Sequence, residues 1–284
     1  MKKLAILLLV LGLLLTFAAC GGGNEPTATT DTDGERHHLR VGIVGAFNIH
    51  WEVIQEMVEE EGIDLELVYF SDFMTPNRAL DEGDIDLNAF QHIMFLEADI
   101  ANNGYEIEPI AETLISPLNI FANHDRISSI ADFQDGHTIA IPSDPTNSGR
   151  ALRLLEAAGL IRLDPNMEGI PSQLDIVERI VDIEIIEAEA GILANMLPDI
   201  EAAAINGTNA LSAGLRLETD SIFKEDITQG NVSELNNVIV VRTEDVEAGG
   251  LRMELFETIV QAYHTERIRD VMLEEFGGAL LPLW

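Results

Sequence analysis

The stretch from Asp144 to Leu155, DPTNSGRALRLL, places two arginines directly after a run of small polar residues. It follows an apolar run at 138–141 that is typical of a strand, and it leads into a segment with helical spacing. Thr146 or Asn147 can cap that helix. The first N–H groups of a helix are unpaired and favour an anion, and a guanidinium binds a carboxylate bidentately. The pattern therefore indicates a candidate carboxylate site at Arg150.

Arg150 has a second interpretation, because the chain is rich in acids that could pair with it. The sequence holds 50 Asp and Glu residues against 16 Lys and Arg. A positive charge in the first turn of a helix is unfavourable by about 0.3–1 kcal/mol, so Arg150 needs an anion there. The sequence leaves open whether that anion is a ligand or a neighbouring acid. For Arg153 we expect a surface ion pair, with Asp144 or Glu156 as its partner.

Strands and helices are expected to alternate along the chain from about residue 39, and these elements must position the arginine. The expected strands are 39–44, 63–70, 84–90, 136–142, 181–186, 201–206 and 236–242. The expected helices are 51–58, one beginning at Pro76, 92–102, 147–158, 188–196 and two between 248 and 276. This alternation predicts an α/β fold with largely parallel sheets, and its division into two runs predicts two lobes.

The N-terminal segment is typical of an export signal and not of a folded element. Two lysines precede an apolar run at 4–19, which is shorter than the roughly 20 residues of a membrane-spanning helix. The run ends at Cys20, the only cysteine of the chain, in a pattern that resembles the lipobox of bacterial lipoproteins. We expect a signal peptide at 1–19, lipidation of Cys20 and a flexible lipid-anchored linker at 20–37. An ordinary secretory signal with an incidental cysteine is the alternative.

The composition excludes several classes of function. A net charge of −34 repels nucleic acid and anionic lipid headgroups, and it argues against a highly anionic ligand. The chain has no Gly-x-Ser-x-Gly, Walker or Gly-x-Gly-x-x-Gly motif, and its seven histidines form no His-x-x-x-His pair. We therefore expect no enzymatic activity, no cofactor and no metal. A site built from histidine and carboxylates that meet only in the folded chain stays the alternative.

Several ordered segments resemble one known family. The segments IAIPSDPTNSGRALRLLEAAGLIRL (139–163) and FSDFMTPNRALDEGDIDLNAFQH (70–92) are similar to those of the methionine-binding lipoproteins of the NlpA type. These are substrate-binding proteins of methionine-uptake ABC transporters. Shorter similarities are AAAING (202–207), NNVIVVR (236–242) and FGGALLPLW (276–284), so the resemblance runs from about residue 39 to the end.

The resemblance implies a two-lobed α/β architecture, the type II periplasmic-binding-protein fold, with a ligand cleft between the lobes. We expect the first lobe at 38–122 plus 235–284 and the second at 123–234. The implied function is a lipid-anchored receptor on the extracytoplasmic face of the cell membrane. It would bind L-methionine or D-methionine and deliver it to an ABC permease with its ATPase subunit. A receptor for a methionine-containing dipeptide or another apolar amino acid, and an exported enzyme on a similar bilobal scaffold, are the alternatives.

The residues that the resemblance places around the ligand are two phenylalanines, a histidine, three asparagines and an arginine: Phe73, Phe90, His92, Asn147, Arg150, Asn206 and Asn237. Arg150 would hold the ligand carboxylate, with Asn147 at the same helix start. Asn206 and Asn237 would contact the amino and carboxylate groups. The phenylalanines and His92 would line the side-chain end, where a thioether gains about 0.3–1.5 kcal/mol from contact with an aromatic ring.

Three positions near the expected pocket depart from the family pattern. Phe73 stands where a tyrosine is usual, Ala89 replaces a common aromatic residue, and Trp51 stands in a loop that usually reads Pro-His-Ala-Glu. These changes leave the exact ligand open. From position alone the phenylalanines could also fill a core, His92 could cap the helix that it begins, and the asparagines could serve turns.

Overall fold

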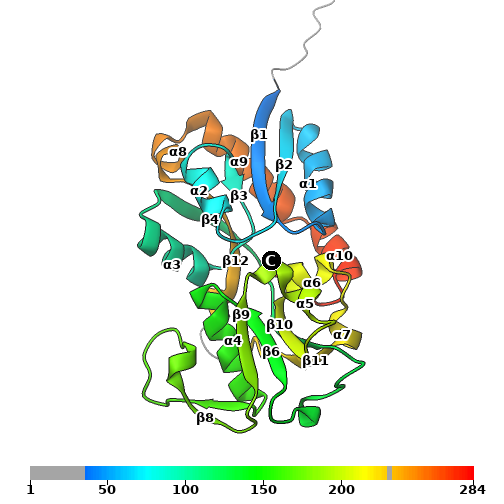
Figure 1. Ribbon diagram of the computed structural model, residues 1–284. Helices are drawn as coiled ribbons and strands as arrows, with labels where there is room; N and C mark the ends of the chain where they lie inside the picture. The colour runs from blue at the N-terminus through cyan, green and yellow to red at the C-terminus, as the bar shows by residue number, and fades with distance from the viewer. Residues whose placement is uncertain (1–35, 229–231) are drawn as a thin grey trace, which may run out of the picture. The chain divides into compact units, whose positions relative to one another are not determined.

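The computed structural model describes residues 36–228 and 232–284 of the 284-residue chain. The expected signal peptide at 1–19, Cys20 and most of the expected linker at 20–37 lie outside the described residues. At the end of that linker the structure differs from the prediction, because His37 is already the first residue of a strand. The described residues belong to the compact unit Glu35–Trp284, which contains two large β-sheets and their helices (Figure 1).

The first sheet has six strands in the order β13-β4-β12-β3-β1-β2. They are β1 (His37–Val44), β2 (Ile63–Phe70), β3 (Leu87–Asn88), β4 (Ile107–Ile115), β12 (Asn236–Arg242) and β13 (Leu281–Pro282). Six helices accompany this sheet: α1 (Ile49–Glu59), α2 (Pro76–Asp81), α3 (Ile93–Asn103), α8 (Thr243–Ala248), α9 (Gly250–Tyr263) and α10 (Glu266–Glu275). Strand β1 is parallel to β2 and β3, whereas β12 is antiparallel to β3 and β4. The strand expected at 84–90 is thus reduced to two residues.

The second sheet has five strands in the order β11-β5-β10-β6-β9. They are β5 (Leu118–Ala122), β6 (Thr138–Pro142), β9 (Glu184–Ala188), β10 (Ala202–Asn206) and β11 (Ser221–Lys224). The accompanying helices are α4 (Pro145–Ala157), α5 (Leu193–Met196), α6 (Gly207–Ser212) and α7 (Leu217–Asp220). A separate pair is formed by β7 (Ile161–Leu163) and β8 (Ile176–Arg179). Short 3-10 turns are η1 (Ile130–Asp132), η2 (Gln173–Asp175), η3 (Ala190–Ile192) and η4 (Val232–Leu235).

Two connections carry the chain between the sheets. The first is residues 116–117, between β4 and β5, and the second begins at Glu225, directly after β11. We expected 118–122 in the first lobe, but in the structure this strand pairs with β10 and β11 of the second sheet. Both pairings are antiparallel, as are those of β12, so the sheets are less parallel than expected. Strand β5 enters its sheet directly from β4 through residues 116–117, without the helical crossover that a parallel neighbour needs.

Helix α4, which carries the arginine of interest, begins earlier than the sequence suggested. Asp144 is its N-cap, and the Asp144 carboxylate accepts the backbone N–H of Asn147 at 2.9 Å. Pro145 occupies the first helical position, where its missing N–H costs nothing. The expected cap at Thr146 or Asn147 was therefore wrong. As a result Arg150 lies in the second turn of the helix and not in the first.

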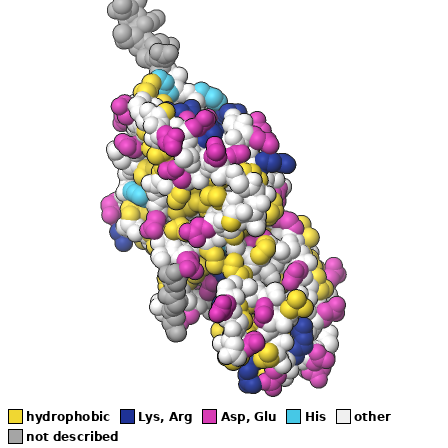
Figure 2. All heavy atoms as spheres, turned by 90° about the vertical axis from the view of Figure 1, so that its left-hand side faces the viewer, with side chains coloured by type: hydrophobic (Ala, Val, Ile, Leu, Met, Phe, Trp, Pro, Cys, Tyr) yellow, Lys and Arg dark blue, Asp and Glu magenta, His cyan; other side chains and the backbone are white. Residues whose placement is uncertain are grey.

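Each large sheet has its own buried core. Side chains of β1 and α1, such as Ile43 and Ile54, pack with Phe256 of α9 in the first. In the second, Ile139 of β6 packs with Leu152 of α4. Two separate cores support two lobes that each fold around their own sheet. Figure 2 shows that Asp and Glu side chains are distributed over the whole visible face of the molecule, while Lys and Arg are sparse.

Candidate functional site

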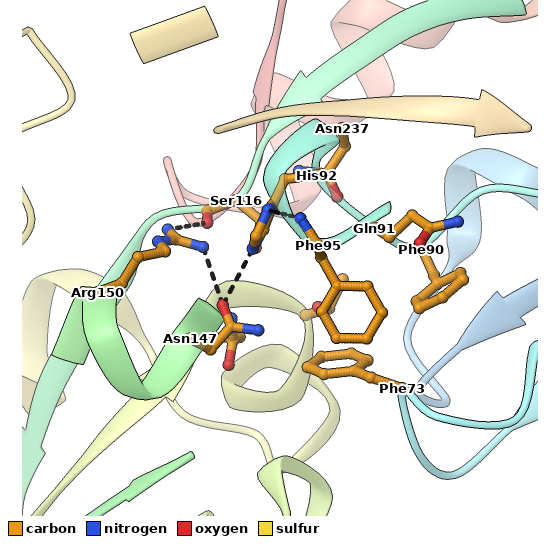
Figure 3. Close-up of a pocket in the computed structure, with 11 residues that line it drawn as sticks. Phe73, Phe90, Gln91, His92, Phe95, Ser116, Asn147, Arg150 and Asn237 are labelled. Atoms are coloured by element: carbon orange, nitrogen blue, oxygen red, sulfur yellow. Dashed lines mark hydrogen bonds between the residues drawn. The ribbon is translucent and has the colours of Figure 1, made fainter. Parts of the chain in front are cut away.

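A small cavity lies where the loop after β3 and the start of α3 meet the first turns of α4 and the end of β10 (Figure 3). It encloses about 20 Å³, which is room for roughly one water molecule. Its lining residues are Phe73, Phe90, Gln91, His92, Phe95, Ser116, Asn147, Arg150, Asn206, Thr208 and Asn237. All the ligand-site residues proposed from the sequence are among them. The structure thus brings together side chains that lie far apart in the chain.

Arg150 reaches the cavity from α4, and its guanidinium is already paired with a carboxylate. Its Nε and Nη2 donate to the two carboxylate oxygens of Glu225 at 3.1 and 2.6 Å. Nη2 also donates to the Ser116 carbonyl at 3.2 Å, and Nη1 donates to Oδ1 of Asn147 at 3.1 Å. The side chains of Arg150 and Glu225 are only 5% and 14% exposed. The ion pair that the sequence left as the second interpretation is therefore present, and the protein itself occupies the bidentate face of the guanidinium.

Asn147 is the point where the polar side chains of the cavity meet. Its Oδ1 accepts from Nε2 of His92 at 3.2 Å, from Nη1 of Arg150 at 3.1 Å and from Nδ2 of Asn206 at 3.0 Å. Its own Nδ2 donates to both carboxylate oxygens of Asp144 at 3.1 Å. An amide oxygen has two lone pairs, so three donors converge on an acceptor that fully satisfies two. At least one of these donors is available to another acceptor in the cavity.

His92 uses its two ring nitrogens for different tasks. It is the N-cap of α3, where its Nδ1 accepts the backbone N–H of Phe95 at 3.0 Å. The neutral ring therefore carries its hydrogen on Nε2 and donates it to Asn147. Burial, reinforced by the charge of Arg150, lowers the pKa of His92 to about 3. Thus His92 caps a helix, as the alternative interpretation held, and also presents a neutral donor to the cavity.

Three phenylalanines form an apolar wall on the side of the cavity opposite Arg150 (Figure 3). The rings of Phe73 and Phe90 stack with centroids 6.1 Å apart. Phe95 meets both edge-on, at 6.2 and 6.0 Å. Ala190, from the second lobe, packs in the same cluster. Apolar packing behind the wall therefore joins the two lobes.

Two polar atoms of the cavity have no hydrogen-bond partner among the described residues. They are Oδ1 of Asn206 and Oγ of Ser116, and both are buried. A buried polar atom left unpaired costs about 1–3 kcal/mol. The arrangement therefore suits a bound molecule that donates to Asn206. Asn237 lies at the same end as His92, with which its backbone forms a β-bridge.

The position of Trp51 was wrongly predicted. Trp51 is 1% exposed and packs against Tyr263 in the core of the first sheet, with ring centroids 5.3 Å apart. Ala89 packs against the same core. Neither residue lines the cavity, so of the three departures from the family pattern only Phe73 changes its wall. Trp51 lies in the first turn of α1, and the helix turns this side chain toward the core of the first sheet.

Arg153 also differs from the expectation. Its Nη2 donates to the carbonyl of Gly169 at 3.1 Å. Among the described residues it forms no ion pair with Asp144 or Glu156, whose carboxylates accept backbone N–H groups instead. Its place on the exposed face of α4, away from the cavity, agrees with the prediction.

Five residues in or next to the site were not predicted from the sequence: Gln91, Phe95, Ser116, Thr208 and Glu225. Gln91, Phe95 and Thr208 lie within three residues of a predicted site residue, so proximity could have found them. Ser116 and Glu225 carry no local signal. They arrive through the two connections between the lobes, whose path only the folded chain reveals.

Within the part of the chain that the structure describes, no group of three or more His, Cys, Asp or Glu side chains is placed to hold a metal ion. No helix of that part is long and apolar enough to cross a membrane.

Comparison with known sequences gives close matches over nearly the whole chain. The family model described as NlpA lipoprotein matches residues 39–284. The D-methionine-binding lipoprotein MetQ of Salmonella typhi is 37% identical over 276 residues, which cover 95% of this chain and 98% of that protein. Outer membrane lipoprotein 3 of Mannheimia haemolytica is 37% identical over 257 residues, covering 90% and 94%.

Solved structures agree with these matches. The substrate-binding protein of a methionine transporter from Streptococcus pneumoniae is similar with a TM-score of 0.81 at 33% identity, covering 87% of this chain and 96% of that one. A nutrient-binding protein from Burkholderia cenocepacia bound to methionine has a TM-score of 0.79 at 32% identity, covering 87% and 100%. The fold is accordingly the two-lobed type II periplasmic-binding-protein fold. On these matches of sequence and structure, the chain belongs to the NlpA lipoprotein family.

Proposed function

We propose that this protein is the substrate-binding lipoprotein of an ABC importer and that it binds methionine in the cavity around Arg150. The observation that carries the proposal is the meeting of one cation, an unpaired amide oxygen and three phenylalanines in one buried space. The relatives support it, since one is named for binding D-methionine and one solved structure contains methionine. Phe73, Phe90, His92, Asn147, Arg150, Asn206 and Asn237 form the proposed ligand site.

The carboxylate of the ligand would bind where donors exceed acceptors. Nε and Nη2 of Arg150 are used by Glu225 and the Ser116 carbonyl, but Nη1 has a second N–H beyond the one given to Asn147. His92 and Asn206 also donate to Oδ1 of Asn147, and because this oxygen fully satisfies two donors, one of these N–H groups is available to the ligand carboxylate as well. A charged hydrogen bond of this kind contributes about 1.5–3 kcal/mol.

The ammonium group and the side chain of the ligand have matching places at the two ends of the cavity. Oδ1 of Asn206 is a buried acceptor without a partner, and an ammonium supplies the donor that it lacks. The thioether would lie against Phe73, Phe90 and Phe95, where sulfur–ring contacts are favourable. His92 is neutral and adds no charge to this end.

Ligand entry requires a wider cavity than the one observed. Space for about one water molecule does not hold an amino acid, and the walls come from both lobes. The lobes would therefore separate to admit the ligand and close around it, a common motion of two-lobed binding proteins. The two connections that start at 116 and 225 are the segments that absorb such a motion.

The receptor would work at the membrane together with a transporter. It would be tethered to the membrane by a lipid on Cys20, face the extracytoplasmic side and pass its ligand to an ABC permease with its ATPase subunit. It would act as a binding protein and not as an enzyme. Support comes from the names of the relatives, which are lipoproteins and transporter substrate-binding proteins.

Calorimetry of the chain from Gly21 onward tests the proposal. The protein is unfolded and refolded first, so that any ligand that co-purifies is removed and can be identified by mass spectrometry. We expect L-methionine or D-methionine to bind with a Kd well below millimolar. Absence of heat with both at millimolar concentration would rule the function out. Norleucine and a glycyl-methionine dipeptide, titrated in the same way, separate methionine from the alternative ligands.

A further inference from the structure

We propose that Glu225 determines the charge type of the ligand. By offsetting the charge of Arg150, it makes the cavity accept molecules that carry an ammonium group together with their carboxylate and reject those that carry the carboxylate alone. This inference rests on the proposed function. Glu225 does not line the cavity and acts through Arg150, so its role differs from that of the lining residues.

The first support is the geometry of the ion pair. Both oxygens of Glu225 face Arg150, one to Nε at 3.1 Å and one to Nη2 at 2.6 Å, which is the fork that a ligand carboxylate would otherwise use. The pair is nearly buried, so the two charges are poorly screened by solvent. A second carboxylate that approaches Arg150 meets the negative charge of Glu225 as well.

The second support is that Glu225 is fixed in place and does not swing aside easily. Its Oε2 also accepts the backbone N–H of Leu118 at 2.8 Å, and its own backbone N–H donates to Oδ1 of Asn119 at 3.1 Å. Leu118 and Asn119 open β5, directly after the first connection between the lobes. Glu225 opens the second connection. The carboxylate is therefore anchored by backbone at the point where both connections meet the arginine.

The third support is the charge count. Among the residues that line the cavity, Arg150 alone carries a full charge, because His92 is kept neutral by burial. Glu225 offsets this charge, and the buried carboxylate of Asp144, which accepts from Asn147, is offset by the N-terminus of α4 that it caps. A zwitterion adds no net charge to this balance, whereas a monoanion brings an uncompensated negative charge into a buried space, which is unfavourable.

The test compares two ligands that differ only in the ammonium group: L-methionine and 4-(methylthio)butanoate, its deaminated analogue. We expect the wild type to prefer methionine by at least roughly a hundredfold. In Glu225→Gln, which keeps the size of the side chain, we expect this ratio to fall at least tenfold, mainly through tighter binding of the monoanion. Glu225→Asp keeps the charge, and its ratio should stay within about threefold of the wild type.

Glu178→Gln is the matched control, because Glu178 pairs with Arg162 in the same lobe but both side chains are exposed. It removes the same charge and should leave the ratio unchanged. If Glu225 only positioned Arg150, the Glu225→Gln variant would bind both ligands more weakly by the same factor. An unchanged ratio of the two affinities would therefore overturn the inference. Should Glu225→Gln fail to fold, the wild type still decides, since binding of the monoanion within tenfold of methionine contradicts the inference. A wild type that binds neither ligand overturns the proposed function itself.

Discussion

His92 and Asn147 join the two lobes across the cavity, with Nε2 of His92 lying 3.2 Å from Oδ1 of Asn147. His92 begins α3 beside the first sheet, and Asn147 lies in the first turn of α4 beside the second. The same Oδ1 accepts from Arg150, so the contact between the lobes and the position of the arginine depend on one oxygen. A ligand that competes for these donors acts on both at once.

Replacement of Arg150 by lysine tests the proposed carboxylate site. Lysine keeps the charge and so avoids leaving Glu225 buried without a cation, but it cannot bind Glu225, Asn147 and the Ser116 carbonyl from one rigid plane. We expect methionine affinity to fall by about 2 kcal/mol, measured by calorimetry. Arg153→Lys, three residues further along the same helix, is the control and should bind as the wild type does. Equal affinities of the two variants would contradict the role of Arg150.

Truncation of Asn147 should weaken both binding and stability. Asn147→Ala removes one hydrogen-bond partner from each of Asp144, Arg150 and Asn206, at about 1–3 kcal/mol for each freed group that water cannot reach. We expect a lower melting temperature and at least a roughly tenfold weaker affinity for methionine. Asn166→Ala, in an exposed turn of the second lobe, should change neither. A variant at Asn147 with normal affinity would show that the convergence of donors is unimportant for the ligand.

A glycine in the second lobe controls how closely the lobes approach. A Cβ at Gly191 would lie 2.7 Å from the backbone oxygen of Ser71, which follows β2 of the first sheet. We expect Gly191→Ala to bind methionine at least about tenfold more weakly, because the lobes cannot reach their observed contact. The melting temperature without ligand should change little, since each lobe retains its own core. Gly191→Val should weaken binding further, and a series without such a trend would argue against the contact.

Acid should destabilise the protein partly through His50. Burial among Trp51, Tyr263 and Phe276 lowers the pKa of His50 to about 3. Between that value and the unfolded pKa of about 6.5, the unfolded chain binds the extra proton, so stability falls as the pH drops through this window by up to about 1.4 kcal/mol per pH unit.

The variant His50→Phe removes this contribution and also the unpaired Nδ1. Its free energy of unfolding, measured by denaturant titration, should therefore depend less on pH than that of the wild type between about pH 4 and 6. Above pH 7 the two curves should run parallel. Identical slopes in the acid range would contradict the shift of the His50 pKa.

The elements of the fold could be predicted where a residue pattern is local. The strand at 63–70 was found with its observed bounds, and the strand at 236–242 likewise. The sheet to which 118–122 belongs could not be found, because a fully buried strand shows no alternation that distinguishes one sheet from another. Only pairing with β10 and β11 decides it.

The residues of the site, too, could be predicted only where the signal in the sequence is local. Arg150 was identified because a strand, a turn and a helix start follow one another in the sequence, and Asn147 was assigned from the family resemblance. The partner of Arg150 could not be identified, because Glu225 lies 75 residues away and nothing local distinguishes it from the many other acidic residues of this chain. Trp51 was misplaced for a related reason, as the sequence does not tell which way a side chain turns at the start of α1.

The small volume of the cavity has a consequence for the time course of binding. A methionine enters only those molecules in which the walls stand further apart, so the association rate scales with the fraction of such molecules. Changes that weaken the contact between His92 and Asn147 raise that fraction. They should therefore speed the capture of the ligand and, by the same weakening, shorten the time for which it is held.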